Sequence, residues 1–171
     1  MLKRFLPSAH VKSIFEITPE KLLEQGVKGI ITDLDNTLVS WDTRDATQEV
    51  IDWLALMNAS GIKVSVLSNN NEERVSYFCA PLGTPYVFSA RKPLAKSFKR
   101  AAREMNLEKD KIVVIGDQLL TDVLGGNSAG FNTILVVPIV KTDGRITRFN
   151  RMIERRLLNY FRKKGLIEWE E

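Results

Sequence analysis

The chain has 171 residues, of which 44% are hydrophobic and 27% are charged, a balance typical of one globular domain and not of a disordered or fibrous chain. Cys79 is its one cysteine, which excludes an internal disulfide and a cysteine-based zinc cluster and favours a reducing compartment. No stretch reaches the roughly 20 apolar residues of a membrane-spanning helix, and the first residues lack the apolar run of a secretory signal. We therefore expect a soluble, cytoplasmic protein.

The formal net charge of +4 is concentrated near the C-terminus. The segment 145–164 holds eight basic residues and one acid, Glu154, whereas residues 1–144 carry equal numbers of acids and bases. This distribution predicts a basic surface element and not a protein that is basic throughout.

The predicted elements alternate between helices and strands. Thr18 as an N-cap, Pro19 in the first turn and Gly26 after the last turn predict a short helix. Apolar runs predict strands and apolar periodicity predicts helices. In chain order the pattern predicts a helix over 18–26, a strand over 29–33, a helix over 46–60, a strand over 63–68, a helix over 72–79, a strand over 86–88, a helix over 93–106, a strand over 111–117, a helix over 121–129 and a strand over 132–137.

This alternation predicts an α/β protein with three layers and a Rossmann-like fold, built on a central parallel five-stranded sheet. Three of the strands are continuous apolar runs, as expected when helices cover both faces of the sheet. No repeat, linker or low-complexity tract divides the chain. We expect a single domain over 1–171, with a core over about 26–140 and a basic amphipathic helix over about 145–164.

Acidic residues follow two of the predicted strands. Asp33 and Asp35 come after the first strand, and Asp117 and Asp122 come after the fourth. The carboxyl ends of parallel strands form the ligand crevice of such a sheet. Carboxylates gathered there repel one another and are costly to bury, and a hard divalent cation such as Mg²⁺ resolves the conflict.

The same edge carries groups that suit a phosphoryl ligand. Ser68 ends the second strand, and Lys92 follows the third; a hydroxyl and an ammonium can bind phosphoryl oxygens. An aspartate can attack phosphorus, and a second carboxylate two residues along can protonate the leaving oxygen and later activate water. The alternatives are structural: a loop turn for Asp33 and Asp35, a helix cap and a solvated acid for Asp117 and Asp122, a helix cap for Ser68 and a surface position for Lys92.

The ordered set resembles the haloacid dehalogenase-like (HAD) phosphatase superfamily from about residue 29 to residue 137. The resemblance depends on four motifs, each of which follows a predicted strand. They are the DxDx(T/V) motif at Asp33, Asp35 and Thr37, the hydroxyl at Ser68, the lysine at Lys92, and the GDxxxxD motif at Gly116, Asp117 and Asp122.

The resemblance implies roles for these residues. Asp33 would be the nucleophile and Asp35 the acid/base. Magnesium would be held by Asp33, the backbone carbonyl of Asp35, and Asp117, with Asp122 as a supporting or alternative ligand. Ser68 and Lys92 would hold the phosphoryl group and steady the nucleophile.

Two neighbouring residues are candidates for substrate contact. Thr37 ends the first motif, and its alternative role is to close a turn. Asn69 follows Ser68 and would act through its backbone N–H or its amide.

No cap domain is expected. Only 30 residues separate Thr37 from Ser68, and 23 separate Ser68 from Lys92, so each interval has room for one helix and its connections. An open site of this kind suits a bulky substrate, or a partner that acts as a lid.

Within the superfamily the chain is similar to the YqeG-type subgroup, which includes mitochondrial phosphatidylglycerophosphate phosphatases. The supporting stretches are the leader over 6–17, the Asp-Leu-Asp-Asn-Thr-Leu run, Ser-Asn-Asn, Lys-Pro, and Gly-Asp-Gln-Leu-Leu-Thr-Asp-Val. The resemblance implies hydrolysis of a phosphoester substrate, phosphatidylglycerophosphate, to phosphatidylglycerol. The alternatives are a soluble phosphoester substrate and a noncatalytic binding or scaffold protein.

The basic segment is predicted to be amphipathic. One predicted face carries apolar residues, and the opposite face carries arginines. They are Ile146, Phe149, Ile153, Leu157, Tyr160 and Phe161 on the first face, and Arg148, Arg151, Arg155 and Arg162 on the second, flanked by Arg145, Arg156 and Lys163.

Two interpretations of this helix stay open. It packs its apolar face on the sheet and solvates its arginines, or it lies on anionic lipid at the inner face of the membrane, which would make the protein peripheral. Nucleic acid is not favoured, because no nucleic-acid module accompanies the helix. The oligomeric state is not predicted.

Overall fold

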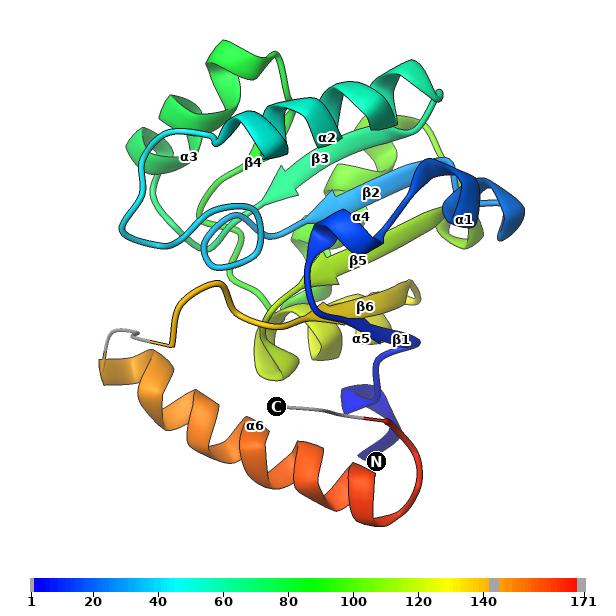
Figure 1. Cartoon of the computed structure of the whole chain (residues 1–171), viewed down its shortest axis with the longest axis vertical. Helices are drawn as coiled ribbons and strands as arrows, with labels where there is room; N and C mark the ends of the chain where they lie inside the picture. The colour runs from blue at the N-terminus through cyan, green and yellow to red at the C-terminus, as the bar shows by residue number, and fades with distance from the viewer. Residues whose placement is uncertain (1, 142–144, 169–171) are drawn as a thin grey trace.

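The computed structural model describes residues 2–141 and 145–168, and it describes the side chains of the last helix from residue 148 onward. Six parallel strands form one sheet in the order β1-β6-β5-β2-β3-β4 (Figure 1). The strands are β1 (Ala9–Val11), β2 (Gly29–Thr32), β3 (Lys63–Leu67), β4 (Tyr86–Val87), β5 (Ile112–Gly116) and β6 (Asn132–Val136). The predicted parallel α/β class is confirmed.

The predicted number of five strands is wrong by one. The additional strand, β1, pairs with β6 at the edge of the sheet, with Ala9 opposite Ile134 and Val11 opposite Val136. A strand of three residues with a histidine at its centre has neither an apolar run nor an alternating pattern. Its pairing with a strand more than 120 residues away is decided by tertiary structure.

The helices form two layers on the sheet. Their bounds are α1 (Pro19–Glu24), α2 (Gln48–Ala59), α3 (Glu72–Cys79), α4 (Ala95–Met105), α5 (Leu124–Ala129) and α6 (Arg145–Lys163), with short turns η1 (Leu2–Phe5), η2 (Ile14–Glu16), η3 (Ala80–Leu82), η4 (Lys109–Lys111) and η5 (Leu119–Val123). Ile30 of β2 packs in one core cluster with α1, α2 and α3. Its neighbour Ile31 packs in a second cluster with α4 and α5 on the other face. Adjacent residues of one strand thus serve both layers.

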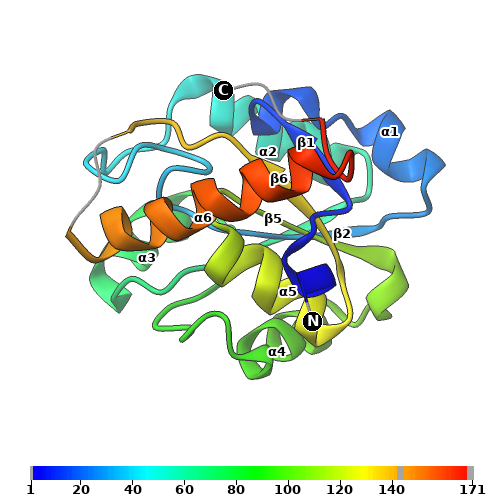
Figure 2. The same ribbon diagram turned by 90° about the horizontal axis from the view of Figure 1, so that it is seen from below.

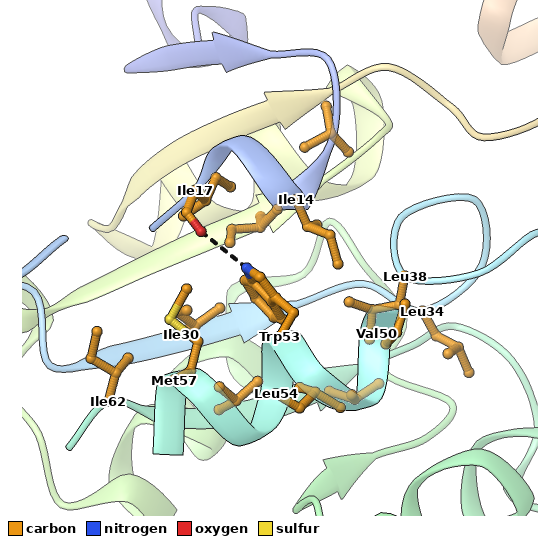
Figure 3. Close-up of a cluster of buried hydrophobic side chains, with 14 of the residues drawn as sticks. Ile14, Ile17, Ile30, Leu34, Leu38, Val50, Trp53, Leu54, Met57 and Ile62 are labelled. Carbon is orange, nitrogen blue, oxygen red and sulfur yellow. Dashed lines mark hydrogen bonds between the residues drawn. The ribbon is translucent and has the colours of Figure 1, made fainter. Parts of the chain in front are cut away.

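Trp53 is at the centre of the larger cluster (Figure 3). Its indole lies between α2 and the segment that precedes α1, and its Nε1–H donates to the carbonyl of Ile17 at 3.0 Å. Thr47 begins α2, because its Oγ1 accepts from the N–H of Val50. The bond from Trp53 connects the N-terminal segment to the core that supports β2.

The last helix, α6, lies beside the β1–β6 side of the sheet (Figure 2). Leu158 packs with Leu119 and Val123 of η5 and with Leu135 of β6. The predicted apolar face is turned inward in part: Phe161 is 1% exposed and Leu157 packs against this cluster, whereas Phe149 is 60% exposed and Tyr160 is 44% exposed. The predicted apolar position Ile146 and its neighbour Arg145 have side chains outside the described part.

No inserted domain is present between β2 and β4 in the part of the chain that the structure describes. The β2–β3 connection contains α2, and the β3–β4 connection contains α3 and η3. Among residues 2–141 and 145–168, no helix is long and apolar enough to cross a membrane.

Replacement of Trp53 by phenylalanine keeps most of the apolar volume and removes the N–H that satisfies the carbonyl of Ile17. A buried acceptor without its donor costs about 1–3 kcal/mol, so the free energy of unfolding in urea should fall by that amount. Leu56→Ala is the control, because Leu56 is on the same helix and 50% exposed; it should stay within about 0.5 kcal/mol of wild type. Equal losses in the two variants would contradict the role of the hydrogen bond.

Candidate active site

Asp33 and Asp117 lie side by side because their strands are neighbours. Thr32, the last residue of β2, pairs with Ile115 of β5, and the N–H of Asp33 donates to the carbonyl of Ile115 at 2.9 Å. Both aspartates are buried, and so is Asp122. One carboxylate oxygen from each of the three lies within 4.8 Å of the other two. The predicted convergence of these acids at one end of the sheet is what the structure displays.

Lys92 lies between two of the carboxylates. Its Nζ is 2.8 Å from Oδ1 of Asp33 and 2.6 Å from Oδ1 of Asp122, and all three side chains are buried. The amide of Asn69 fixes the backbone of Lys92, because its Oδ1 accepts from the Lys92 N–H at 2.7 Å and its Nδ2 donates to the Lys92 carbonyl at 3.2 Å. The segment after β4 therefore places the ammonium inside the acidic cluster.

Gly116 provides the space for Asp122. A Cβ at position 116 would lie 2.2 Å from Cγ of Asp122. Two carbon atoms cannot approach this closely, so the side chain of Asp122 would have to move. The second oxygen of Asp122 accepts from the N–H of Gln118 at 3.2 Å. A glycine at the end of β5 is thus required for Asp122 to reach Lys92.

Burial dominates the electrostatics of the cluster. It raises the pKa of Asp33, against the attraction of Lys92, and it holds the pKa of Asp117 well above its ordinary value, against the attraction of Arg151. Burial alone would lower the pKa of Lys92, but the attraction of Asp122 and Asp33 outweighs it and raises that pKa. The cluster therefore favours a further cation, which would relieve the buried negative charge.

The carboxylate of Asp35 has its hydrogen-bond partners outside the buried cluster. Its Oδ1 accepts from Nε and Nη2 of Arg74 at 3.2 and 2.9 Å, and its Oδ2 accepts from Nδ2 of Asn70 at 3.0 Å. Its side chain is 21% exposed. Asp35, to which the sequence assigns acid/base chemistry, is therefore near solvent and comes two residues after Asp33 in the chain.

Arg74 was not anticipated as a site residue. It is on α3, and its guanidinium also donates from Nη1 to the carbonyl of Arg44 at 3.1 Å. The sequence offers no signal for this contact, because the fold brings α3 next to the loop after β2. Asn70, which the sequence places after the second motif, is the other partner of Asp35.

The remaining predicted residues are near the cluster and already hydrogen-bonded within the protein. Oγ1 of Thr37 donates to Oδ1 of Asp117 at 3.1 Å, and Oγ of Ser68 accepts from the N–H of Asn70 at 3.1 Å. Both residues are buried. The structure thus brings Thr37, Ser68 and Asn69 to the same edge as Asp33, and it joins Thr37 to an acid of the cluster.

Arg151 of α6 also reaches the cluster, which the sequence did not predict. The periodicity places Arg151 on a solvated face, but its Nη2 forms an ion pair with Oδ2 of Asp117 and its Nη1 donates to the Asp117 backbone carbonyl at 2.7 Å. The expectation fails because Glu154 is itself buried and lies beside Arg151. The buried face of α6 therefore includes charged residues.

Comparisons with known proteins agree with this geometry. A family model described as HAD-hydrolase-like matches residues 89–147. The chain is 61% identical over its whole length to the probable phosphatase YqeG of Bacillus subtilis, all of which is covered. The chain belongs to the YqeG family of HAD-like phosphatases. It is thus a hydrolase of phosphomonoesters.

A more distant relative carries a substrate in its name. The chain is 26% identical over 94% of its length to phosphatidylglycerophosphate phosphatase 1 of Arabidopsis thaliana, a chloroplastic and mitochondrial protein, and spans 49% of that relative.

Solved structures support the HAD-like fold. The cobalt-bound form of the deoxy-D-mannose-octulosonate 8-phosphate phosphatase of Haemophilus influenzae aligns with a TM-score of 0.57 at 15% identity, over 80% of this chain and 91% of that one. CbbY of Rhodobacter sphaeroides, in complex with phosphate, aligns with a TM-score of 0.54 at 12% identity, over 69% of this chain and 90% of that one.

Replacement of Lys92 by methionine should destabilise the phosphatase in the absence of metal. The change leaves Asp33 and Asp122 buried without their shared cation, a loss of about 3–5 kcal/mol when one partner of a buried ion pair is removed. Urea unfolding in EDTA measures it. Lys96→Met, at an exposed position of α4, removes the same charge and should change stability by less than about 0.5 kcal/mol. An unchanged free energy of unfolding in Lys92→Met would contradict this account of the cluster.

Proposed function

We propose that the chain is a magnesium-dependent phosphomonoester hydrolase that acts through an aspartyl-phosphate on Asp33. The observation that carries the proposal is the cluster of three buried carboxylates at one end of the sheet, two of which, Asp33 and Asp122, pair with Lys92. A cluster of this kind is costly to bury unless cations complete it.

The donor set suits a hard divalent cation. The ligand atoms of Asp33, Asp117 and Asp122 are all carboxylate oxygens within 4.8 Å of one another. The two cations that pair with them, Lys92 and Arg151, leave an excess of negative charge. Oxygen donors of this type match Mg²⁺. We assign the ion to Asp33, Asp117 and the backbone carbonyl of Asp35, with Asp122 as a supporting or alternative ligand. When bound, Mg²⁺ supplies neutralisation of phosphoryl charge.

Asp33 and Asp35, the two carboxylates after β2, have different roles in the proposed reaction. In the first step a carboxylate oxygen of Asp33 attacks phosphorus, the bond from phosphorus to the ester oxygen breaks, and Asp35 gives its proton to that oxygen. In the second step Asp35 takes a proton from water, whose oxygen attacks the same phosphorus and releases phosphate from Asp33. In the structure Asp35 is paired with Arg74 and Asn70, and it would exchange these contacts for the ester oxygen and water in the two proton transfers.

Four further residues bind or orient. Lys92 and Ser68 would contact the phosphoryl oxygens, and Lys92 also holds Asp33 through its ion pair. Asn69 fixes the backbone of Lys92, and Thr37 restrains Asp117 through its hydroxyl. Since Thr37 contacts Asp117 and Asn69 contacts Lys92, we place Thr37 and Asn69 beside the substrate.

Asp33→Asn should abolish turnover with little change in fold, because the amide has the shape of the carboxylate but is a poor nucleophile. Hydrolysis of p-nitrophenyl phosphate in Mg²⁺ should fall by at least about 10³-fold, as for other covalent nucleophiles.

Asp110→Asn is the matched control, because Asp110 is exposed in η4, and it should keep wild-type turnover. Wild-type activity should vanish in EDTA and return with Mg²⁺. Substantial hydrolysis by purified Asp33→Asn would remove the nucleophile assignment.

For the substrate we propose a phospholipid phosphate monoester, phosphatidylglycerophosphate, converted to phosphatidylglycerol at an anionic membrane surface. The name of the Arabidopsis relative supports this choice. So does α6, whose outward side exposes Phe149, Met152 and Tyr160. Basic residues are exposed among them, at Arg148, Arg155, Arg156, Arg162 and Lys163. Exposed apolar and basic side chains on one helix suit a membrane surface.

The substrate proposal predicts a preference for lipid. At equal Mg²⁺, kcat/KM for phosphatidylglycerophosphate in anionic vesicles should exceed that for glycerol 3-phosphate by at least about 10-fold. The double variant Arg155→Ser with Arg156→Ser should weaken vesicle binding about 30-fold, because each basic residue near such a surface contributes about 1 kcal/mol. Its hydrolysis of the soluble ester should not change.

The double variant Lys96→Ser with Lys99→Ser is the control, because it removes the same charge from exposed positions of α4. Its vesicle binding and its hydrolysis of the soluble ester should both stay unchanged. Preference for a sugar phosphate or a nucleotide would contradict the lipid assignment and favour a soluble substrate. Binding of a partner without hydrolysis of any phosphoester would favour a noncatalytic role.

A further inference from the structure

Arg151, on the inner face of α6, contacts the acidic cluster. Nη1 of Arg151 donates to the backbone carbonyl of Asp117 at 2.7 Å, and Nη2 pairs with Oδ2 of the same residue. One guanidinium therefore binds both the main chain and the side chain of Asp117. Two contacts from one planar group define an orientation better than a single point charge does.

Glu154 positions Arg151 in turn. It is 3% exposed, its Oε2 accepts from Nη1 of Arg151 at 3.2 Å, and its Oε1 accepts from the N–H of Leu120 at 3.1 Å. Since a buried carboxylate is costly unless it is paired, these two donors account for the presence of Glu154 in the interface. The residue links α6 to the start of η5, the turn that carries Asp122.

The attachment of α6 does not depend on Arg151 alone. Leu158 packs with Leu119, Val123 and Leu135, and Phe161 is 1% exposed. Burial of a leucine and a phenylalanine stabilises the docked helix independently of the ion pair that Arg151 makes. A change at Arg151 should therefore leave α6 in place.

Asp117 is held from two sides. Thr37 donates to Oδ1 at 3.1 Å and Arg151 pairs with Oδ2, so the carboxylate is fixed against rotation. Each carboxylate oxygen has two acceptor positions, and one contact on each oxygen leaves positions for a cation. One carboxylate oxygen of Asp117 also lies within 4.8 Å of a carboxylate oxygen of Asp33 and one of Asp122.

We propose that Arg151 is a positioning residue, which holds Asp117 for the divalent ion and makes α6 part of the active site. The proposal rests on the proposed function, because it concerns the same metal site. Partners of this kind orient metal ligands, and their removal typically costs 10–100-fold in metal affinity.

The test compares the full-length wild type with Arg151→Met and Arg151→Lys. Mg²⁺ binding is measured by titration calorimetry, and the Mg²⁺ dependence of p-nitrophenyl phosphate hydrolysis is measured beside it. In Arg151→Met the Kd for Mg²⁺ should rise by at least about 10-fold. Arg151→Lys should recover part of that loss, because an ammonium keeps the charge but not the two-pronged geometry.

Lys164→Met is the control, because it removes a positive charge from an exposed position just after α6 that is not among the residues proposed for lipid contact. Its Kd for Mg²⁺ should stay within about two-fold of wild type. Urea unfolding in EDTA reports whether α6 remains docked. If Arg151→Met does not fold, Glu154→Gln tests the same chain of contacts, because it keeps an acceptor for Leu120 and weakens the hold on Arg151; its Mg²⁺ binding should weaken several-fold.

Mg²⁺ binding by Arg151→Met as tight as in wild type, or tighter, would overturn the proposal, and so would a wild type that binds no Mg²⁺. Failure of the proposed function looks different. A wild type that binds Mg²⁺ but hydrolyses no phosphoester would remove that function, while weaker Mg²⁺ binding in Arg151→Met would still support the positioning role.

Discussion

The central constraint on this protein is the burial of like charges at one end of the sheet. Asp33, Asp117 and Asp122 are all buried, and their ligand oxygens lie within 4.8 Å of one another. Lys92 offsets part of the repulsion through two short ion pairs. The surrounding structure serves this arrangement, since Gly116 leaves room for Asp122 and Asn69 fixes the backbone of Lys92. A phosphatase of this family needs such a concentration of charge to bind a metal and a phosphoryl group together.

The C-terminal helix has two different sides. Its inner side joins Glu154 and Arg151 to Asp117, and its apolar anchor, Leu158, packs on η5 and β6. Its outer side exposes basic and apolar residues such as Phe149. A single rigid element therefore connects the surface that we propose for lipid with the residue that we propose as a metal ligand. This connection explains how a site without a cap domain in the described residues can be completed by a segment far away in the chain.

The regular part of the fold follows from local patterns. The apolar runs and closing glycines predicted the parallel sheet, five of its strands and the covering helices, because strands buried on both faces have a continuous apolar signal. The edge strand β1 escaped prediction because three residues carry too little pattern. The charged part of the inner face of α6 escaped prediction because periodicity assigns charged residues to solvent, whereas Arg151 and Glu154 compensate each other in the interface.

The sequence by itself determined which residues stand at the strand ends, and hence the cluster of Asp33, Asp117 and Lys92, because parallel strands deliver their carboxyl ends to one edge. It could not determine which side chains arrive from other elements. Arg74 and Arg151 reach Asp35 and Asp117 from helices whose local pattern describes a solvated arginine. Only tertiary packing decided these contacts, because pairing between distant charges depends on the positions of whole helices.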